Sequence, residues 1–213
     1  MNERDDADRP LVTLHINTER TWRGGERQTL LLATGLRDRG HVAEIVCPPG
    51  APLGERARAE GLTTHEFSLR GELNLRAIAR LRRLYRRRDA DIVQMHTSHA
   101  HTLGVLARFG RRRPRTIVAR RVDYSIHRSG TPGFTRLKYG HGVDRYIAIS
   151  EAIGEVLVSD GIDRDRISVV HSGVVPHPPP RSVTSPISRS TRGRSTSCAP
   201  SPPCSKRTPT RIS

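Results

Sequence analysis

The chain has 213 residues and carries 37 basic against 21 acidic side chains, a formal net charge of +16. Its three cysteines fit neither a disulfide framework nor the spacing of a zinc site, and no stretch approaches the roughly 18 apolar residues of a membrane-spanning helix. The first ten residues, MNERDDADRP, lack the apolar core of a secretory signal, so we expect a cytoplasmic protein.

Composition divides the chain into a body and a tail. Residues 176–213 contain nine Pro, nine Ser, five Thr and seven Lys or Arg, with no acidic residue. Such a segment buries too little apolar surface to offset the entropy of ordering it, which predicts a disordered tail. We expect residues 1–10 to be disordered as well and residues 11–175 to form one domain.

The body is still basic, since residues 1–175 hold the remaining 30 Lys and Arg beside all 21 acidic residues. An anionic partner would fit this excess: a phosphorylated substrate, a membrane surface or nucleic acid. A solvated surface rich in arginine is the alternative interpretation.

Short apolar runs alternate with longer amphipathic stretches along the body. The runs predicted to be strands are 11–16, 42–47, 63–67, 91–96, 115–120, 145–150 and 166–171. The stretches predicted to be helices are 26–40, 52–61, 72–88, 98–110 and 151–161. Alternation of this kind, with strands rich in β-branched residues, predicts an α/β fold: a Rossmann-like parallel sheet with helices on both faces.

In such a sheet, ligands bind outside the carboxyl ends of the strands, so the residues after each strand are the candidates for a site. The loop after the first strand contains WRGGERQ. Gly24 and Gly25 would let a ligand approach the backbone, and the following helix start offers free N–H groups to an anion. The loop matches neither G-x-G-x-x-G nor a P-loop, so we predict no nicotinamide or ATP site. A turn that needs positive φ is the alternative.

The fourth predicted strand ends in HTSHAH, with His96, His99 and His101. Neither a helical i, i+4 pair nor a carboxylate accompanies these histidines, so we predict no metal site. His96 lies at the strand end, where it is best placed to meet a substrate. His99 and His101 are expected near a helix N-terminus, on the surface or in a cleft.

Two later strand ends carry further polar residues. Arg120, Arg121 and Asp123 follow the fifth strand, where a guanidinium would hold an anionic group. Exposed surface charges are the alternative for these residues. Ser150 ends the sixth strand and is predicted to cap the helix that begins at Glu151, with a ligand contact as an additional role.

Together these stretches resemble the N-terminal domain of the family 4 glycosyltransferases, which have the GT-B fold. The resemblance runs from about residue 10 to Gly173, through RGGERQTLLLATGLRDRGH, DIVQMH, RRVDY and VDRYIAISEAIGEVLVSDGIDRDRISVVHSGV. It implies a retaining transferase built from two Rossmann-like domains that face each other across a cleft. The first domain mainly holds the acceptor, a glycan or lipid-linked molecule of the kind used for cell envelope polysaccharide. The second domain holds the nucleotide-sugar, a co-substrate, so no cofactor is implied.

The resemblance also implies roles for the residues at the strand ends. Gly24 and Gly25 would lie near the phosphates of the donor, and His96 near the transferred sugar as the catalytic candidate. Gln94 stands where relatives often have the first histidine of H-x-H. The remaining roles are donor-phosphate or substrate contacts for Arg120, Arg121 and Ser150, and acceptor-side contacts for His99, His101 and Asp123.

The resemblance stops at Val175, where relatives have an aspartate before the second domain. We therefore expect the chain to hold the acceptor-side half only, followed by a tail of frame-shifted sequence, and to have little or no transferase activity alone. A free-standing Rossmann-like ligand-binding module is the main alternative. A nucleic-acid-binding protein is a more remote one, because only 4% of residues are aromatic and no binding motif is present.

The helix predicted over residues 72–88 suggests a second surface. Its apolar stripe of Leu73, Ala77, Leu81, Leu84 and Tyr85 should face the sheet. Arg76, Arg80, Arg83 and Arg87 would then point outward, where they could meet an anionic membrane surface on its inner face. A solvated arginine face is the alternative.

Overall fold

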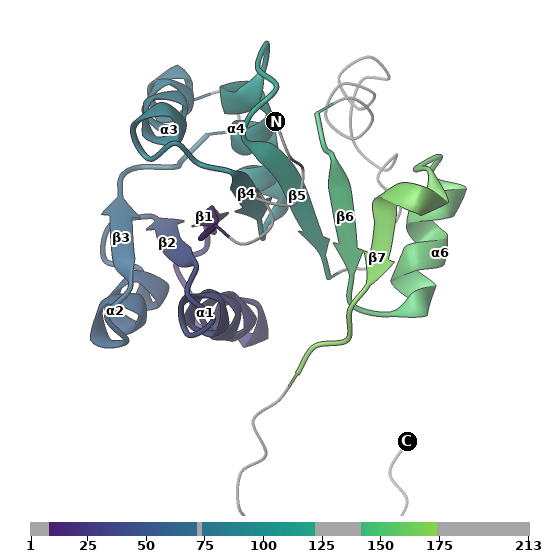
Figure 1. The fold of residues 1–213 in the computed structure, drawn as a ribbon, viewed down its shortest axis with the longest axis horizontal. Helices are drawn as coiled ribbons and strands as arrows, with labels where there is room; N and C mark the ends of the chain where they lie inside the picture. The colour runs from purple at the N-terminus through teal and green to yellow at the C-terminus, as the bar shows by residue number, and fades with distance from the viewer. Residues whose placement is uncertain (1–8, 72–73, 122–141, 174–213) are drawn as a thin grey trace, which may run out of the picture. The chain divides into compact units, whose positions relative to one another are not determined.

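Seven parallel strands form one sheet in the computed structural model, in the order β3-β2-β1-β4-β5-β6-β7 (Figure 1). The structure describes residues 9–71, 74–121 and 142–173. The chain divides into two units, 1–174 and 175–213, and every described residue lies in the first. The predicted Rossmann-like parallel sheet is confirmed. The tail predicted over 176–213 lies outside the described residues.

Every predicted strand and helix is present, with ends that differ by a few residues. The strands are β1 Val12–Ile16, β2 Val42–Cys47, β3 Thr63–Glu66, β4 Ile92–Met95, β5 Arg115–Arg120, β6 Arg145–Ala148 and β7 Ile167–Val169. The helices are α1 Gly24–Arg37, α2 Pro52–Ala59, α3 Leu75–Arg87, α4 Ser98–Arg108 and α6 Glu151–Ser159, with a 3-10 turn η3 at Arg164–Arg166. The α3 helix starts at Leu75 because the side chain of Asn74 accepts a hydrogen bond from the Ala77 N–H at 3.0 Å. Leu73 of the predicted stripe lies outside the described residues.

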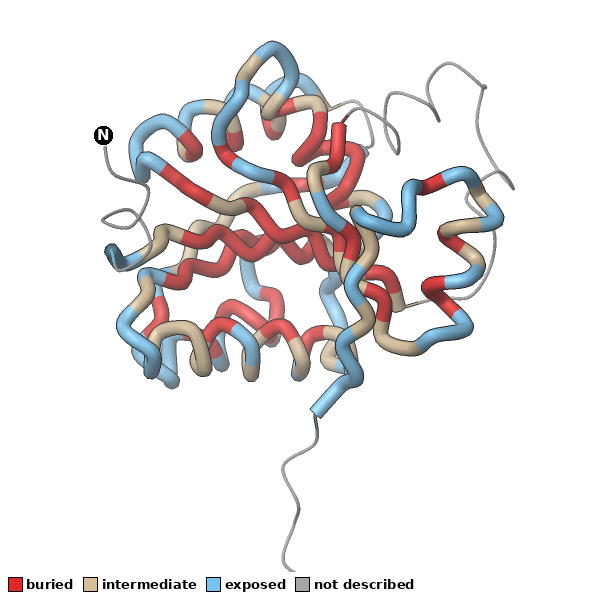
Figure 2. Tube along the Cα trace, turned by 45° about the vertical axis from the view of Figure 1, so that its right-hand side comes forward, coloured by how far each residue is buried: buried red, intermediate tan, exposed pale blue. Residues whose placement is uncertain are grey.

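Helices cover both faces of the sheet, and each face has its own apolar cluster. Figure 2 shows the central strands buried along most of their length. Helices α3, α4 and α6 cover one face, where Leu81, Leu103 and Leu157 from the helices join Leu14 of β1 and Tyr146 of β6 in one buried cluster. Helices α1 and α2 cover the other face over β2, with a smaller cluster that includes Ala33, Ile45, Cys47, Leu53 and Ala57. Among the described residues, no helix is both long enough and apolar enough to cross a bilayer.

The strand order reverses at β1, which pairs with β2 on one side and with β4 on the other. From β1 the chain builds outward through β2 to β3, and then returns to β4 and builds the other way. The loops that leave β1 and β4 therefore diverge at the carboxyl edge of the sheet. A crevice opens at such a reversal, and this is where ligands bind in open α/β sheets.

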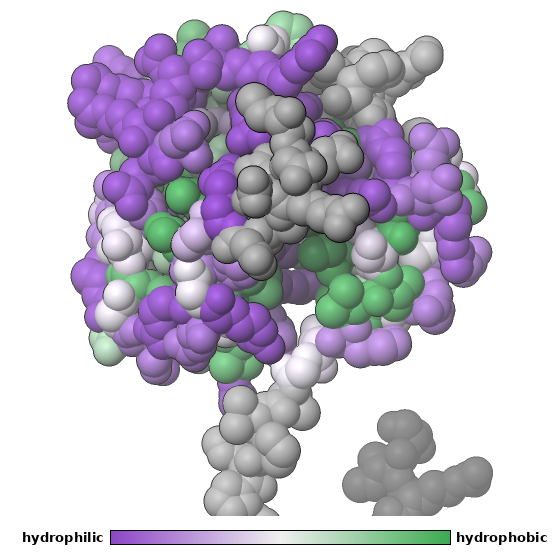
Figure 3. Space-filling model, in the orientation of Figure 1, coloured by the Kyte–Doolittle hydropathy of each residue, from purple (hydrophilic) through white to green (hydrophobic). Residues whose placement is uncertain are grey.

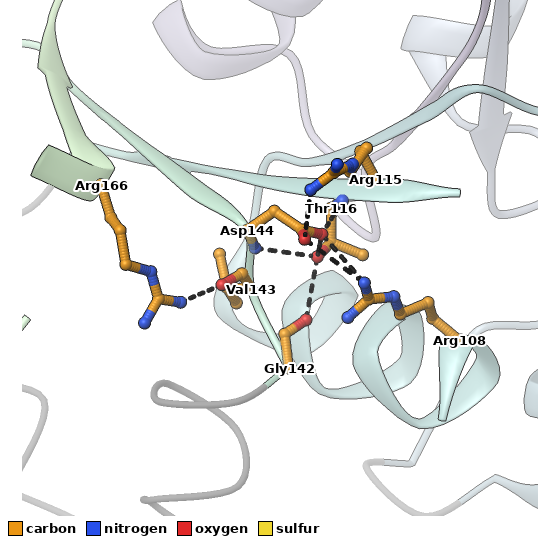
Figure 4. A network of polar contacts seen from close by, with 7 residues as sticks. All are labelled: Arg108, Arg115, Thr116, Gly142, Val143, Asp144 and Arg166. Atoms are coloured by element: carbon orange, nitrogen blue, oxygen red, sulfur yellow. Dashed lines mark hydrogen bonds and ion pairs between the residues drawn. The ribbon is translucent and has the colours of Figure 1, made fainter. Parts of the chain in front are cut away.

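Asp144 links the amino-terminal ends of β5 and β6, at the edge of the sheet opposite the crevice (Figure 4). Its carboxylate accepts the backbone N–H of Thr116 at 2.7 Å and lies 3.2 and 3.4 Å from the guanidinium groups of Arg108 and Arg115. Burial would raise the pKa of Asp144, but these hydrogen bonds and charges hold it below its ordinary value. The cluster has a structural role, because it lies at the far edge from the crevice.

The last described residue lies against the first helix. The side-chain amide of Gln28, in α1, donates a hydrogen bond to the carbonyl oxygen of Gly173 at 2.6 Å. The chain thus leaves the described domain one turn of helix away from Gly24 and Gly25.

Candidate functional site

Polar side chains of β1 point away from the larger apolar cluster. Leu14 and Ile16 belong to that cluster. Since side chains alternate along a strand, Thr13 and His15 face the α1 side of the sheet. Both are buried, with 3% and 1% of their surface exposed. Strands of a parallel sheet are usually apolar on both faces, so these polar positions are unusual.

His15 forms a buried pair with His96. The Nδ1 atom of His15 lies 3.2 Å from Nε2 of His96, and Nε2 of His15 lies 3.2 Å from the hydroxyl of Thr13. Burial lowers the pKa of His15 to about 4. Burial, together with His15 and the charge of Arg121, lowers the pKa of His96 well below its ordinary value. Both imidazoles are therefore neutral at neutral pH.

Arg121, directly after β5, joins this pair to the start of α1. One guanidinium nitrogen donates to the carbonyl oxygen of Gly25 at 2.7 Å, and the other lies 3.3 Å from Nδ1 of His96. Burial lowers the pKa of Arg121 and the carboxylate of Glu26 opposes this shift, but an arginine stays charged. The structure thus brings together three predicted site residues, Gly25, His96 and Arg121.

Gly24 and Gly25 are the first residues of α1, and neither has a positive φ. The alternative interpretation of this loop as a positive-φ turn is therefore wrong. A Cβ atom at Gly25 would lie 3.0 Å from Nη1 of Arg121, whereas one at Gly24 would meet nothing within 4 Å. A side chain at position 25 would push the guanidinium of Arg121 away from this glycine.

Glu26 ties the glycine loop to β1. Its carboxylate accepts the backbone N–H of Arg23 at 2.9 Å and the side-chain amide of Asn17 at 3.2 Å. Asn17 follows β1 directly, and Glu26 is only 4% exposed. The first turn of α1, whose leading N–H groups have no partner within the helix, is thereby fixed beside Arg121. A cation next to a helix N-terminus forms an environment suited to an anionic group such as a phosphate.

The other predicted site residues are more widely spread. Ser150 caps α6, its hydroxyl accepting the Ile153 N–H at 3.4 Å. Arg120 is 8% exposed and, by the alternation of β5, faces the opposite side of the sheet from Arg121. His101 is buried within α4, and His99 is half-buried with its Nε2 atom lacking a hydrogen-bond partner in the described part of the chain. Asp123 lies outside the described residues.

Sequence reasoning missed Thr13, His15, Asn17 and Glu26. The signal was the alternation of polar and apolar residues in TLHIN at the end of the first strand. In residues 9–71, 74–121 and 142–173, no three His, Cys, Asp or Glu side chains group as metal ligands.

Comparison with known proteins gives both a family and a fold. The sequence model of Glycosyltransferase Family 4 matches residues 22–177. A search of curated protein sequences found no match.

Three solved structures show the same fold. They are a glycosyltransferase from Rickettsia africae (TM-score 0.66, 20% identity, 78% of this chain and 44% of that one), Anabaena HepE in complex with UDP (TM-score 0.64, 16% identity, 77% and 44%) and the lipopolysaccharide outer core galactosyltransferase WaaB in its apo form (TM-score 0.57, 15% identity, 81% and 49%). The chain spans less than half the length of each of these proteins.

Proposed function

Because the chain belongs to glycosyltransferase family 4, we propose that it supplies the acceptor-side half of a retaining transferase that moves a sugar from a nucleotide-sugar to a glycan or lipid-linked acceptor. The cluster of Arg121, His96 and Gly25 at the reversal of strand order carries this proposal. The lipopolysaccharide galactosyltransferase among the similar structures supports cell envelope polysaccharide as the class of acceptor.

In this proposal the leaving diphosphate lies between Arg121 and the first turn of α1 at Gly24 and Gly25. The guanidinium and the free N–H groups would neutralise the charge that develops as the diphosphate leaves, which is the usual electrostatic part of catalysis. The complex of HepE with UDP supports a nucleotide-sugar as the donor. His96 would lie beside the transferred sugar.

The proposed substrate contacts extend to the neighbouring strand ends. Ser150, at the end of β6, would add a hydroxyl to the donor side. Arg120 would be a further donor-phosphate or substrate contact. His99, His101 and Asp123 would belong to the acceptor side, with Nε2 of the half-buried His99 as a hydrogen-bonding group for an acceptor.

Titration of the chain with UDP tests the phosphate contact. Arg121→Met should weaken UDP binding by about tenfold or more, because a hydrogen bond to a charged group contributes about 1.5–3 kcal/mol. Arg112→Met is the matched control, since Arg112 is an exposed arginine in the loop before β5, at the other edge of the sheet. Equal UDP affinities for the two variants would contradict the proposed phosphate site.

A sugar-transfer assay tests whether the acceptor-side half needs the donor-side domain for activity. The 213-residue chain, supplied with nucleotide-sugars and a glycolipid extract, should form no product, because most of the diphosphate stabilisation would come from the donor-side domain. Product formation would overturn this part of the proposal. UDP binding without turnover separates a transferase half from a protein that binds no nucleotide. Tight binding of an intact nucleotide-sugar, with affinity similar to that of a whole enzyme, would favour the free-standing ligand-binding module.

We also propose that α3 binds the anionic surface on the inner face of a membrane. Arg76, Arg80, Arg83 and Arg87 are exposed, and none has an acidic partner among the described residues. Figure 3 shows the hydrophilic surface over this helix. Arg80, Arg83 and Arg87 also line a groove of about 540 Å³ between α3 and β3. Leu75, at the start of the helix, is 77% exposed and would enter the interfacial region.

Vesicle co-sedimentation tests the membrane role. The chain should bind vesicles that contain anionic phospholipid, and binding should fall with added salt. The double variant Arg83→Gln/Arg87→Gln should bind less than Arg39→Gln/Arg112→Gln, which removes the same charge from other surfaces. Binding that is equal for the two variants, or insensitive to anionic lipid, would leave α3 as a solvated arginine face.

A further inference from the structure

Five groups form a continuous chain of hydrogen bonds through the site. The Val42 carbonyl oxygen lies 3.1 Å from the Thr13 hydroxyl, which lies 3.2 Å from Nε2 of His15. Nδ1 of His15 lies 3.2 Å from Nε2 of His96, whose Nδ1 lies 3.3 Å from the Arg121 guanidinium. A neutral imidazole has one donor and one acceptor nitrogen, so the position of one proton determines the next along this chain.

At the Arg121 end of this series of hydrogen bonds, the donors and acceptors can be arranged in one direction only. A guanidinium donates and never accepts, so Nδ1 of His96 must be the acceptor and its Nε2 must carry the proton. The Nε2–H of His96 then donates to Nδ1 of His15. His15 must in turn carry its proton on Nε2 and donate it to the hydroxyl of Thr13.

The Val42 end gives the same direction independently. A carbonyl oxygen accepts and never donates, so the single hydroxyl proton of Thr13 is used on Val42. The Thr13 oxygen can therefore only accept from His15, which places the His15 proton on Nε2 and leaves Nδ1 as an acceptor. The burial of both rings keeps them neutral, as this arrangement requires.

We propose that Thr13 and His15 are positioning residues, which hold His96 as its Nε2–H tautomer and so turn the lone pair of its Nδ1 toward Arg121. The guanidinium is then held by two acceptors, Nδ1 of His96 and the carbonyl oxygen of Gly25, with its other N–H groups left for a ligand. The idea that Arg121 then binds a phosphate rests on the proposed function. The tautomer of His96 follows from the hydrogen bonds alone and does not rest on it.

Nitrogen-15 NMR of the histidine rings in the whole 213-residue chain tests the inference without any ligand. Protonated and unprotonated ring nitrogens have separate chemical shifts. At neutral pH we expect His15 and His96 both to be neutral with the proton on Nε2. A His96 ring that is charged, or that carries its proton on Nδ1, would overturn the proposal. Failure of the UDP titration would instead count against the proposed function and would leave this result unaffected.

Variants at Arg121 and Thr13, near the two ends of the hydrogen-bond series, show whether Thr13 and His15 set the tautomer of His96. With Arg121→Met, His96 should remain the Nε2–H tautomer, because the Thr13 end still fixes the pair. With Thr13→Val added, both ends are lost and a mixture of tautomers is expected, which Thr13→Ser in the same background should reverse. A change of the His96 tautomer in the single variant Arg121→Met would show that Arg121 alone sets it, and would refute the role of Thr13 and His15. Arg121→Met changes a residue after the end of β5 and leaves Thr13, His15 and His96 in place, so this test does not depend on the buried variants folding.

Discussion

At the scale of single residues, the candidate site depends on the absence of a side chain as much as on the charged groups around it. The Arg121 guanidinium lies against Gly25 and donates to its carbonyl oxygen at 2.7 Å. A methyl group at this position would lie 3.0 Å from the guanidinium nitrogen. The long side chain of arginine can move aside at little cost in stability, so the consequence falls on ligand binding.

Gly25→Ala should therefore weaken UDP binding several-fold while changing the free energy of unfolding by less than about 1 kcal/mol. Gly35→Ala is the control, because its Cβ would likewise meet an arginine nitrogen, Nη1 of Arg39 at 3.3 Å, in the same helix but away from the proposed phosphate site. Calorimetric titration and urea denaturation of the two variants provide the comparison. If Gly35→Ala weakened binding as much as Gly25→Ala, the contact with Arg121 would not be the reason for the glycine.

The buried histidine pair makes stability depend on pH. Unfolded His15 takes up a proton near its ordinary pKa of 6.5, but the buried side chain does so only at about 4. Between these values the unfolded chain binds more protons, so the free energy of unfolding falls as the pH is lowered from about 6.5 to 4 and His15 adds no further loss below that. The slope for one such histidine is at most about 1.4 kcal/mol per pH unit. His96 acts in the same direction.

Urea denaturation of the wild type and His15→Asn between pH 7.5 and 4.5 measures this effect. The variant should lose less stability on acidification than the wild type. Asp91, Asp144 and Glu44 also have lowered pKa values, so they add a loss in more acidic solution that both proteins share. Parallel stability curves would mean that His15 is not the titrating group.

The sequence predicts His96 as a site residue, but it does not predict that His15 is its partner. His96 directly follows an apolar run, where the ends of parallel strands place ligand-binding residues. His15 lies inside its run, and its role depends on which strand becomes the neighbour of β1. The pairing of β1 with β4 is a long-range contact between residues about 80 positions apart, and no local pattern encodes it. The same holds for Arg121, whose two acceptors come from α1 and the end of β4.

At the scale of elements, a glycine also sets how closely α4 approaches the sheet. A Cβ atom at Gly104 would clash with the sulfur of Met95 and approach the Tyr85 hydroxyl to 3.6 Å. Met95 is fully buried in β4, so it has little room to move. The α4 helix begins directly after His96, with Thr97 as its cap. The packing at Gly104 therefore fixes the helix that leaves the site.

Gly104→Ala should lower the free energy of unfolding by about 1–3 kcal/mol, because overpacking a buried contact costs more than alanine gains in helix propensity. Chemical denaturation checks this, with Gly24→Ala as the uncrowded glycine in another helix. A stabilised Gly104→Ala variant would show that α4 can shift away from β4 without loss.

Periodicity predicted the elements well because each of them carries its own pattern. The predicted strands 42–47 and 115–120 have the observed bounds, and each is buried or half-buried after an exposed first residue. The helix predicted over 72–88 starts later because Asn74 caps it. The prediction followed the apolar stripe back to Leu73 and overlooked this cap. Strand order was beyond such patterns, as it depends on which runs pair across the whole domain.

At the scale of the whole molecule, charge and composition differ between the body and the residues that follow it. All 21 acidic residues precede residue 176, while seven basic residues follow it. Composition of this kind predicts too little apolar surface for a buried core, whereas the described domain buries apolar side chains on both faces of its sheet.

Brief digestion with trypsin should therefore cut first at Arg181, Arg189, Arg192 or Arg194 and leave a stable product that contains the described domain. Cleavage needs a segment that can enter the protease, which strands and packed helices resist. Mass spectrometry of the first products locates the cuts. An initial cut within residues 11–173 would argue against the predicted boundary, and so would full resistance of the segment after residue 176.

The hydrogen bond between Gln28 and Gly173 makes the described domain a tethering point. Because Gly173 is held beside the start of α1, a group attached to the chain there would be kept close to the site. A short flexible linker engineered at this position would give such a group an effective concentration of about millimolar order, whatever the concentration of the protein in solution. A group attached at this position could therefore occupy the crevice even with an intrinsic affinity too weak to hold it there as a separate molecule.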